Sequence, residues 1–248
     1  MHLLSNGTSV DSYSSRAAVK ALDSRVVHPP VLGVPETGKL RPRTLYRARG
    51  KRLFDIVVAS AALIFLAPVM VLVALAVFCT DGAPVYFAQE RVGQNNRRFR
   101  CFKFRTMVSN ADQKLADLFA NDINAIQQWE KNRKLADDPR VTRIGRFLRK
   151  SSLDELPQLL NVLCGSMTLV GPRPIVEEEV WRYGRYIEDY FANRPGITGV
   201  WQVQGRSEMV RYSRRVAMDV WYLKHMNFGL DLWLVLRTVI VVLTMGGV

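Results

Sequence analysis

The sequence has few of the residues that build disulfide or metal frameworks. It contains 3 cysteines and 3 histidines among 248 residues. Cys79, Cys101 and Cys164 are scattered and odd in number, which disfavours a disulfide framework or a structural zinc site and favours a reducing compartment. The histidines are too dispersed along the chain to suggest a metal cluster.

Acidic residues are also scarce, with 22 Asp and Glu against 35 Lys and Arg, so the formal net charge is +13. Such a charge indicates an anionic partner, which could be nucleic acid, an acidic membrane surface or a phosphorylated substrate. The stretch from Lys39 to Arg52 contains 7 basic residues and no acid. Because this run directly precedes an apolar segment, it favours contact with a membrane surface.

The N-terminal residues lack both hydrophobic periodicity and an apolar core of the kind found in signal peptides. Residues 1–47 are rich in Ser, Pro and Gly. We predict a disordered, basic tail here and no cleavable signal peptide.

Charge is absent from the 24 residues between Ile56 and Cys79. As a helix this segment would measure roughly 36 Å, enough to cross the hydrocarbon core of a bilayer. Pro68 lies in its middle and should kink the helix. Both flanks are basic, so the positive-inside rule would keep both ends cytoplasmic. We therefore predict a re-entrant membrane helix over residues 48–80, kinked at Pro68, with a simple spanning helix as the alternative.

Residues 81–248 show mixed helical and extended patterns and no internal repeat. The predicted elements are a short strand in RFRCFKFRTM, helix in residues 109–136, a turn at Asp138 followed by helical pieces, an amphipathic helix over 180–191, a structured loop with short extended pieces over 194–206, and a C-terminal apolar helix from Phe228. Asp231 and Arg237 interrupt that last helix, which favours an interfacial or core-packing position over a membrane span.

Two adjacent carboxylates, Asp154 and Glu155, allow a structural and a catalytic interpretation. Ser152 and Glu155 have the spacing of a capping box, which would place both acids in the ionised first turn of a helix. Pro157 fits a helix that begins at Leu153 or Asp154 better than one capped by Ser152. Neighbouring side chains on a helix point about 100° apart, so the two acids could also act differently around one point.

The surroundings of the acidic pair favour chemistry on a phosphate ester. Basic residues precede it at intervals near three: Arg140, Arg143, Arg146, Arg149 and Lys150. They could form a phosphate-binding stripe or a solvated or membrane-facing surface. Downstream, Pro172 and Pro174 hold Arg173 in an extended backbone, and a fixed guanidinium suits bidentate phosphate recognition.

The motifs KLADDPRVTRIGRFLRKSSLDELPQLLNVLCGSMTLVGPRP, GKRLFDIVVASAALIFLAPVM, KFRTM and RPGITGVWQVQGRS closely resemble the bacterial sugar transferase family, the monotopic polyprenyl-phosphate phosphoglycosyl transferases. The resemblance covers about residues 48–248. It is most similar to members that start exopolysaccharide or O-antigen repeat units by transferring a hexose 1-phosphate. It implies an α/β membrane-associated fold, mostly helical with short strands. A re-entrant helix would precede a catalytic domain, residues 81–248, at the cytosolic face, with interfacial amphipathic helices and a C-terminal one among them.

The resemblance also implies a chemistry. Asp154 would attack the β-phosphorus of a UDP-sugar, release UMP and carry the sugar phosphate to undecaprenyl phosphate, and Glu155 would hold Mg²⁺. Lys103, Arg105 and Arg149 would hold phosphates, with Arg149 the strongest candidate. Pro172, Arg173 and Pro174 would shape the nucleotide pocket. UDP-glucose and UDP-galactose are the expected donors.

The expected location is the cytoplasmic face of the bacterial inner membrane, in contact with the lipid bilayer, with homo-oligomerisation left open and no nucleic acid as a partner. The chain departs from the family at the helix break, where many members have Ser-Pro and this sequence has Ala67-Pro68. Alanine cannot satisfy a carbonyl freed by the kink. Two other functions stay open. A glycosyltransferase that moves the sugar alone would release UDP, and a non-enzymatic basic membrane scaffold for polysaccharide assembly would use the acidic pair as a cap.

Overall fold

The computed structural model describes residues 46–132, 135, 137–204 and 212–244. All but the last two residues of the predicted tail, and the last three residues of the WQVQGRS motif, therefore lie outside the described residues. The chain divides into two units. Among the described residues, the smaller unit comprises part of the segment Met107–Thr142, and the larger comprises residues 46–106 and 143–244 with the gap at 205–211.

The described part of the smaller unit contains two helices where one helical stretch was predicted. They are α3 (Ala111–Asn121) and α4 (Ile123–Asn132). Asp122 separates them, because its Oδ1 accepts hydrogen bonds from the backbone N–H groups of Asn124 at 2.8 Å and Ala125 at 3.2 Å. A side chain that binds the next N–H groups caps a new helix and ends the previous one.

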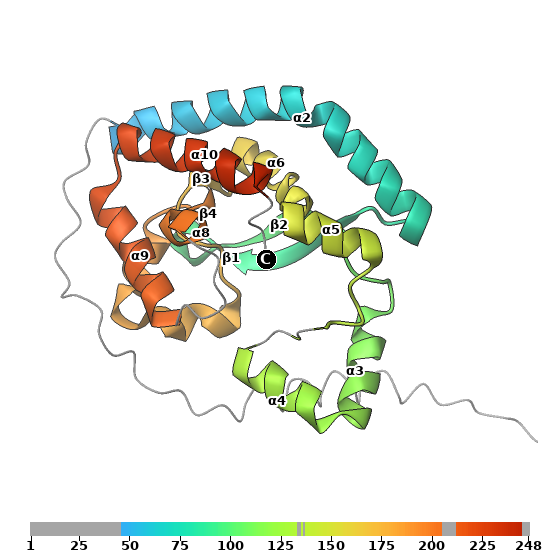
Figure 1. Cartoon of the computed structure of the whole chain (residues 1–248). Helices are drawn as coiled ribbons and strands as arrows, with labels where there is room; N and C mark the ends of the chain where they lie inside the picture. Colours follow the sequence, from blue (N-terminus) through green and yellow to red (C-terminus); the bar gives the residue numbers. More distant parts are fainter. Residues whose placement is uncertain (1–45, 133–134, 136, 205–211, 245–248) are drawn as a thin grey trace, which may run out of the picture. The chain divides into compact units, whose positions relative to one another are not determined.

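The larger unit consists of short strands surrounded by helices (Figure 1). Its elements in chain order are η1 (Tyr46–Gly50), α2 (Lys51–Asp81), β1 (Tyr86–Val92), η2 (Gln94–Asn96), β2 (Arg98–Phe104), α5 (Arg143–Ser151), η3 (Leu153–Glu155), α6 (Gln158–Cys164), β3 (Thr168–Val170), η4 (Glu177–Tyr186), α7 (Ile187–Phe191), β4 (Gly196–Thr198), α8 (Val200–Gln204), α9 (Tyr212–His225) and α10 (Phe228–Leu243). The described residues are mostly helical with short strands, as predicted, and β2 confirms the strand expected in RFRCFKFRTM.

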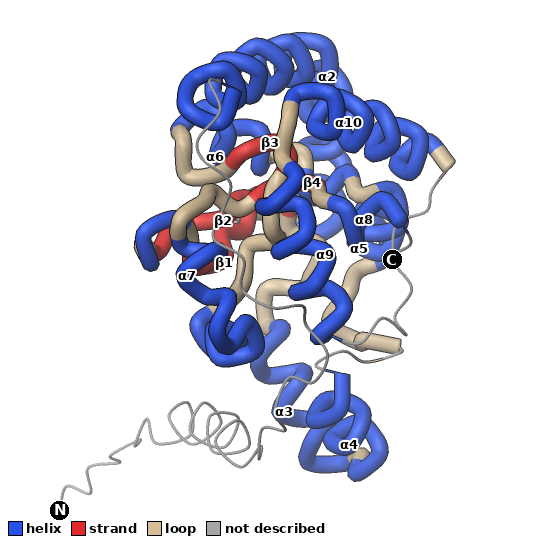
Figure 2. The backbone as a smooth tube through the Cα atoms, turned by 90° about the vertical axis from the view of Figure 1, so that its left-hand side faces the viewer, coloured by secondary structure: helices blue, strands red, loops and turns tan. Residues whose placement is uncertain are grey.

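Two small sheets organise this unit. β1 and β2 form an antiparallel hairpin in which Gln89 lies opposite Cys101, and β3 and β4 pair in parallel. Figure 2 shows both pairs on the same side of α2 and α10. A buried cluster joins α2, α6, β3 and α10, and it includes Ala59, Val162, Val170 and Leu234. Leu153 and Leu156, which flank Asp154 and Glu155, pack against a separate cluster that includes Phe104 and Leu148.

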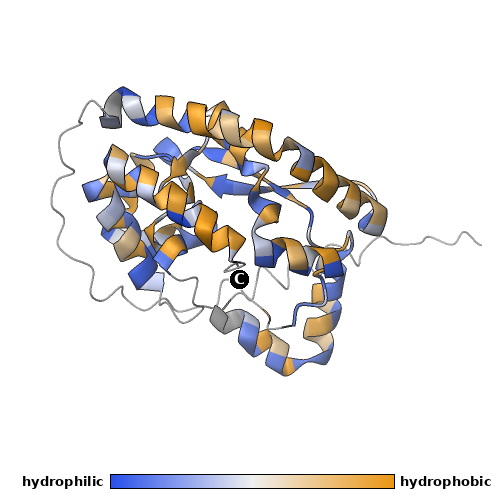
Figure 3. Ribbon diagram, turned by 45° about the horizontal axis from the view of Figure 1, so that its top comes forward, coloured by the Kyte–Doolittle hydropathy of each residue, from blue (hydrophilic) through white to orange (hydrophobic). Residues whose placement is uncertain are grey.

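Helix α2 is the longest helix of the described residues. It runs 31 residues from Lys51 to Asp81 through Pro68 and is the one described helix that is long and apolar enough to cross a membrane. Its ribbon bends partway along (Figure 1), which fits the missing backbone hydrogen bond at a proline. Large apolar side chains on α2 and α10 are exposed, and both helices carry long hydrophobic stretches (Figure 3). Whether α2 spans or re-enters the bilayer stays a prediction.

The N-terminal part of α2 is fixed to the rest of the larger unit by polar contacts. Lys51 pairs with Asp231 of α10 at 2.7 Å, and Arg52 donates to the carbonyl oxygens of Val162 and Leu163 at the end of α6. Asp55, buried within α2, accepts from the hydroxyl of Thr168 at 2.6 Å. Two of the seven charges in the predicted membrane-contacting run are therefore used inside the protein.

The prediction of one amphipathic helix over 180–191 was wrong. The segment contains the end of the 3₁₀ helix η4 and the short helix α7, with non-helical backbone at Gly184. Tyr183, Tyr186 and Tyr190 are buried in a second cluster with Val92 and Ile175. These tyrosines pack into the core and do not form the apolar side of an interfacial helix.

Candidate active site

The acidic pair lies in a tight turn between α5 and α6. Ser152 adopts the left-handed conformation (φ 58°) and its side chain makes no capping hydrogen bond, so the predicted capping box is wrong. Asp154 and Glu155 belong to the separate 3₁₀ turn η3, and α6 begins only at Gln158, after Pro157. Positive φ at a residue other than glycine costs roughly 1–2 kcal/mol and persists where surrounding structure imposes it. A strained residue two positions before an acidic pair is typical of a functional turn.

Lys103 of β2 forms ion pairs with both carboxylates. Its Nζ lies 2.7 Å from Glu155 Oε1 and 3.8 Å from Asp154 Oδ2. The strand and the turn are brought together by Asn161 of α6, which accepts from the backbone N–H of Phe102 at 3.0 Å and donates to the carbonyl of Arg100 at 2.7 Å. β1 pairs with one edge of β2, and the Asn161 amide makes the hydrogen bonds on the other edge that a further strand would make. These bonds fix the distance between Lys103 and the acids.

Asp154 is the more buried of the two acids, with 6% of its surface exposed. Burial raises the pKa of its carboxyl to about 6, while the charges of Lys103 and Arg149 act in the opposite direction and that of Glu155 adds to the rise. The carboxylate is therefore mostly ionised at neutral pH, yet it is held in a poorly solvated position. A desolvated carboxylate next to cations is well suited to attack an electrophilic phosphorus.

Arg149 approaches the acidic turn from the last turn of α5. Its Nε donates to the hydroxyl of Thr106 at 3.0 Å, and its charge acts on the pKa of Asp154. Gly145, one helical turn earlier, makes this position possible, because a Cβ there would lie 2.1 Å from the carbonyl oxygen of Thr106. Only glycine lets α5 approach the KFRTM segment this closely. Arg143 and Arg146 lie on α5 as well, whereas Arg140 lies in a turn and pairs with Asp138 at 2.7 Å.

Arg105, also predicted to hold a phosphate, contacts the end of α2. Its Nη2 donates to the carbonyl oxygens of Asp81 at 2.5 Å and Gly82 at 2.7 Å. The side chain is 7% exposed, and its Nε and Nη1 make no hydrogen bond in the structure. Arg105 thus ties the C-terminal end of the long apolar helix to the strand that carries Lys103, with two donors left over.

The Pro172-Arg173-Pro174 segment is held by hydrogen bonds to Gly196 and Arg91. The carbonyl of Pro172 accepts from Gly196 N–H at 2.8 Å, and a Cβ on Gly196 would lie 2.1 Å from the backbone nitrogen of Gly171. The carbonyl of Pro174 accepts from Arg91 Nη1 at 3.2 Å. Arg173 itself is exposed, and its guanidinium lies 5.5 Å from the centre of the Trp201 ring.

Several residues that position the site or adjoin it were not predicted from the sequence: Arg91, Thr106, Gly145, Asn161, Trp201, Arg215 and Asp219. The one available signal was Asn161, a lone amide in the apolar stretch LLNVL. The others follow from contacts between segments distant in sequence.

Magnesium is implied by the family resemblance, and the acidic turn fits it. No group of three potential ligands among His, Cys, Asp and Glu occurs in the described residues. Mg²⁺ is commonly held by one or two carboxylates together with substrate phosphates. Two adjacent carboxylates, one of them partly exposed beside a lysine, supply such an incomplete set.

Comparison with known proteins shows the class to which this protein belongs, the sugar transferases. Residues 46–245 match the bacterial sugar transferase family, so the chain belongs to that family.

Individual relatives match most of the chain. The exopolysaccharide production protein ExoY of Sinorhizobium fredii is 45% identical over 204 residues, which cover 82% of this chain and 88% of that protein. The undecaprenyl-phosphate galactose phosphotransferase of Salmonella typhimurium is 47% identical over 197 residues, 79% of this chain and 41% of that protein. The undecaprenyl-phosphate glucose phosphotransferase of Komagataeibacter xylinus is 40% identical over 211 residues, 80% of this chain and 37% of that protein.

Proposed function

We propose that the protein transfers a hexose 1-phosphate from a UDP-sugar to undecaprenyl phosphate through a covalent intermediate on Asp154. The observation that carries this proposal is the position of Asp154. Its carboxylate is 6% exposed and lies 3.8 Å from the Lys103 ammonium, which makes its shorter contact with Glu155. Names of two relatives support the reaction class, since both are described as undecaprenyl-phosphate hexose phosphotransferases.

In the first step an Asp154 carboxylate oxygen forms a bond to the β-phosphorus of the UDP-sugar. The bond between that phosphorus and the oxygen bridging to the α-phosphate breaks, and UMP leaves with the electron pair. Lys103 and Arg149 lie where they can balance the charge of the phosphate oxygens. The product on the protein is a sugar phosphate joined to the Asp154 carboxyl as a mixed anhydride.

In the second step a phosphate oxygen of undecaprenyl phosphate attacks the same phosphorus. The bond to Asp154 breaks, the carboxylate is regenerated, and a polyprenyl diphosphate sugar leaves. Glu155 would hold Mg²⁺, which supplies neutralisation of the negative phosphate oxygens. Both displacements occur at phosphorus, so the sugar keeps its anomeric configuration.

The acceptor is a membrane lipid, and α2 and α10 supply apolar surfaces suited to the bilayer. With α2 bent and re-entering at the cytoplasmic face of the inner membrane, the acidic turn would lie near the level of the lipid phosphate. Arg105 and Asn161 support this placement, because they link the end of α2 and the acidic turn to the same strand, β2.

Galactose and glucose are the sugars named in the relatives, and UDP-galactose and UDP-glucose are therefore the donors we propose. The test uses the full chain in detergent with undecaprenyl phosphate, Mg²⁺ and each radiolabelled UDP-sugar. We expect UMP release together with label in the lipid phase. Release of UDP would assign the protein to glycosyltransferases that move the sugar alone. No label in the lipid phase with any donor would support a scaffold role.

A further inference from the structure

Phe87 of β1 lies across the hairpin from Lys103, the lysine that pairs with both acids. In the antiparallel register Phe87 is directly opposite Lys103. Opposite residues of such a pair point to the same face of the sheet, with Cβ atoms about 5 Å apart. The Lys103 ammonium in turn lies 3.8 Å from Asp154. The phenyl ring therefore belongs to the face of the hairpin from which Lys103 reaches the two acids.

The Phe87 ring is half exposed and lies outside the core. It is 52% exposed and belongs to none of the three buried apolar clusters of the described residues. Cys101, two residues before Lys103 on the same face, is almost fully buried in the cluster that joins α2, α6, β3 and α10. Core residues thus cover this face at Cys101 and leave it open at Phe87 and Lys103. Single exposed apolar side chains are ordinary on a protein surface, but this one adjoins the candidate reacting groups.

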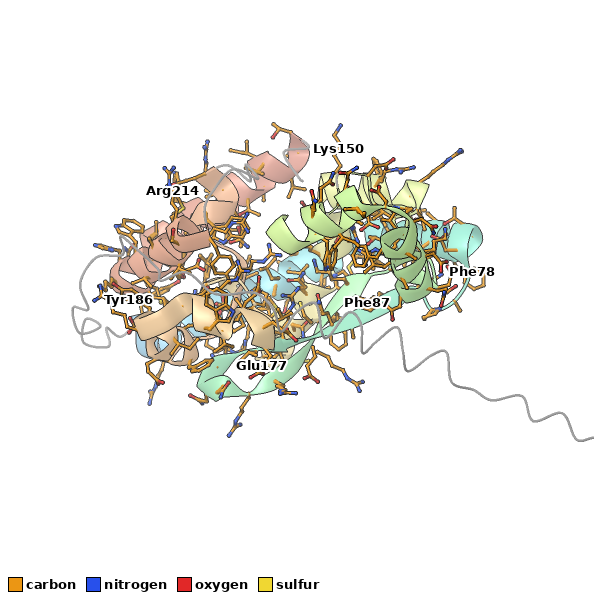
Figure 4. The ribbon with its side chains drawn as sticks, turned by 90° about the horizontal axis from the view of Figure 1, so that it is seen from below. Phe78, Phe87, Lys150, Glu177, Tyr186 and Arg214 are labelled. Carbon is orange, nitrogen blue, oxygen red and sulfur yellow. The ribbon has the colours of Figure 1, made fainter. Side chains whose placement is uncertain are left out.

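An exposed apolar stripe on α2 leads to the same end of the hairpin. It consists of Val71, Leu75 and Phe78, which recur at helical spacing and are each more than half exposed. Only residues 82–85 separate the end of α2 from β1. Figure 4 labels Phe78 and Phe87, which lie on these two consecutive elements.

The end of α2 is held against the strand that carries Lys103. Arg105, two residues after that lysine, donates from its side chain to the carbonyl oxygens of Asp81 and Gly82 and from its backbone N–H to that of Val85. The acidic turn packs on the same part of the helix, since its two leucines join the cluster of α2 residues Val73 and Val77. The second half of α2 therefore adjoins both the acidic turn and the beginning of β1.

The chemistry of the three substrate groups decides which of them suits an exposed phenyl ring. The sugar and the nucleotide carry hydroxyl or amide groups, for which the ring offers no hydrogen-bond partner. The phosphate of undecaprenyl phosphate is bonded directly to a five-carbon isoprene unit. When that phosphate attacks the phosphorus held by Asp154, the isoprene unit lies directly beside the reacting groups. An apolar ring at this place removes hydrocarbon surface from water, which is favourable.

We propose that Phe87 contacts the first isoprene unit of the acceptor and so determines which phosphates can accept the sugar phosphate. The proposal rests on the proposed function for the identity of the acceptor. The Lys103 ammonium then faces the acceptor phosphate, the Phe87 ring faces the hydrocarbon next to it, and the rest of the chain follows the apolar stripe of α2. Phe87 takes no part in the bond changes, so the first displacement by Asp154 does not depend on it.

The test uses two soluble phosphates as inhibitors of transfer to undecaprenyl phosphate by the full chain in detergent. Dimethylallyl phosphate has one isoprene unit and methyl phosphate has none. We expect the unaltered protein to bind dimethylallyl phosphate more tightly than methyl phosphate. Phe87→Ala should raise the inhibition constant of dimethylallyl phosphate and the KM of undecaprenyl phosphate about 10-fold, the order expected for partial burial of one apolar side chain. Methyl phosphate should be unaffected, and Phe87→Leu should recover part of both losses.

Tyr86→Ala is the matched control. Tyr86 is also 52% exposed, but as the neighbouring residue of the strand it points to the other face, where its ring stacks on Phe104 with 5.2 Å between ring centres. This variant should leave both inhibition constants unchanged. Exchange of radiolabelled UMP into UDP-sugar without acceptor measures the first displacement alone. Phe87→Ala should retain that exchange, which also shows that the variant is folded.

Several results would refute the contact with the isoprene unit. Equal binding of the two phosphates by the unaltered protein would do so, as would unchanged constants in Phe87→Ala. A raised KM for the UDP-sugar with unchanged acceptor constants would assign Phe87 to the hexose, and loss of the UMP exchange would give the ring a structural role. Failure of the proposed function is distinct, because the unaltered protein would then catalyse no UMP exchange. Direct titration of both phosphates would still compare their binding.

Discussion

Two lysine–carboxylate centres in the larger unit have the same shortest nitrogen–oxygen distance but differ in how exposed their side chains are. Lys51 lies 2.7 Å from Asp231, and Lys103 lies 2.7 Å from Glu155. Asp231 is 0% exposed, and both of its oxygens are bound, since Tyr222 donates to one and Tyr46 and Lys51 donate to the other.

At the second centre the lysine is shared and partly accessible. The side chains of Lys103 and Glu155 are 26% and 30% exposed, and Asp154 lies at 3.8 Å, beyond hydrogen-bonding distance. A centre whose hydrogen bonds are complete holds α2 against α10. A centre whose lysine is shared between two acids and is partly exposed is accessible to a ligand, and that difference separates a structural ion pair from a candidate active site.

Asp154→Asn tests the Lys103 centre, and of all the variants it should have the largest effect. We expect transfer to fall about 10³-fold or more, since an amide cannot act as the nucleophile. The folded-state pKa of Asp154 is raised to about 6, so above pH 6 its ionised form lowers stability, and a neutral amide should leave the melting temperature equal or higher. UMP release and thermal unfolding in detergent measure the two effects, with Asp112→Asn on exposed surface as the control. A melting temperature several degrees lower would place Asp154 with the structural centre.

Asp231→Leu tests the buried Lys51–Asp231 centre. It leaves Lys51 buried without its counter-ion, which should cost about 3–5 kcal/mol of unfolding free energy. The double variant Lys51→Met with Asp231→Leu should recover most of that loss, because no buried charge is left unpaired. Denaturant titration in detergent measures both variants, and UMP release per folded molecule should stay near that of the unaltered protein. If the double variant is no more stable than the single one, the ion pair is not the main link between α2 and α10.

Glu155→Gln should affect the metal requirement more than the fold. We expect the Mg²⁺ concentration for half-maximal transfer to rise, with a loss of roughly 10- to 100-fold at low Mg²⁺ that excess metal partly restores. Glu188→Gln, on the exposed side of α7, is the matched control. A loss of activity that does not depend on Mg²⁺ concentration would show that Glu155 acts through Lys103 alone.

Local sequence patterns predicted the strand at Lys103, the long apolar helix and the acidic pair, because each depends on neighbouring residues. The capping box failed, since Ser152 adopts a left-handed conformation that the α5–η3 junction imposes. No local pattern could show that Asp231 would pair with Lys51, which lies 180 residues earlier, or that Arg215 would stack over Trp201. The helix over 180–191 failed because buried tyrosines and Gly184 outweighed its amphipathic pattern.

Asp219 shares features with both centres, and its expected effect lies in the pH dependence of stability. It is buried like Asp231, yet its Oδ1 has no hydrogen-bond partner in the structure, and burial raises its pKa to about 7. The hydroxyl of Tyr183 and the charges of Arg173 and Arg215 act in the opposite direction. In the unfolded chain the pKa is about 3.9. Between pH 4 and 7 the folded protein therefore binds the proton more tightly, and stability from this group falls as pH rises, by at most about 1.4 kcal/mol per pH unit.

Asp219→Asn removes that titration. The difference in unfolding free energy between the unaltered protein and the variant should accordingly shift in favour of the variant from pH 5 to pH 7 and become constant above it. Denaturant titrations at pH 5, 6, 7 and 8 measure this difference. A difference independent of pH would mean that Asp219 is ionised throughout and permanently paired with Arg173 and Arg215. It would then belong with Asp231 as part of the framework that holds the larger unit together.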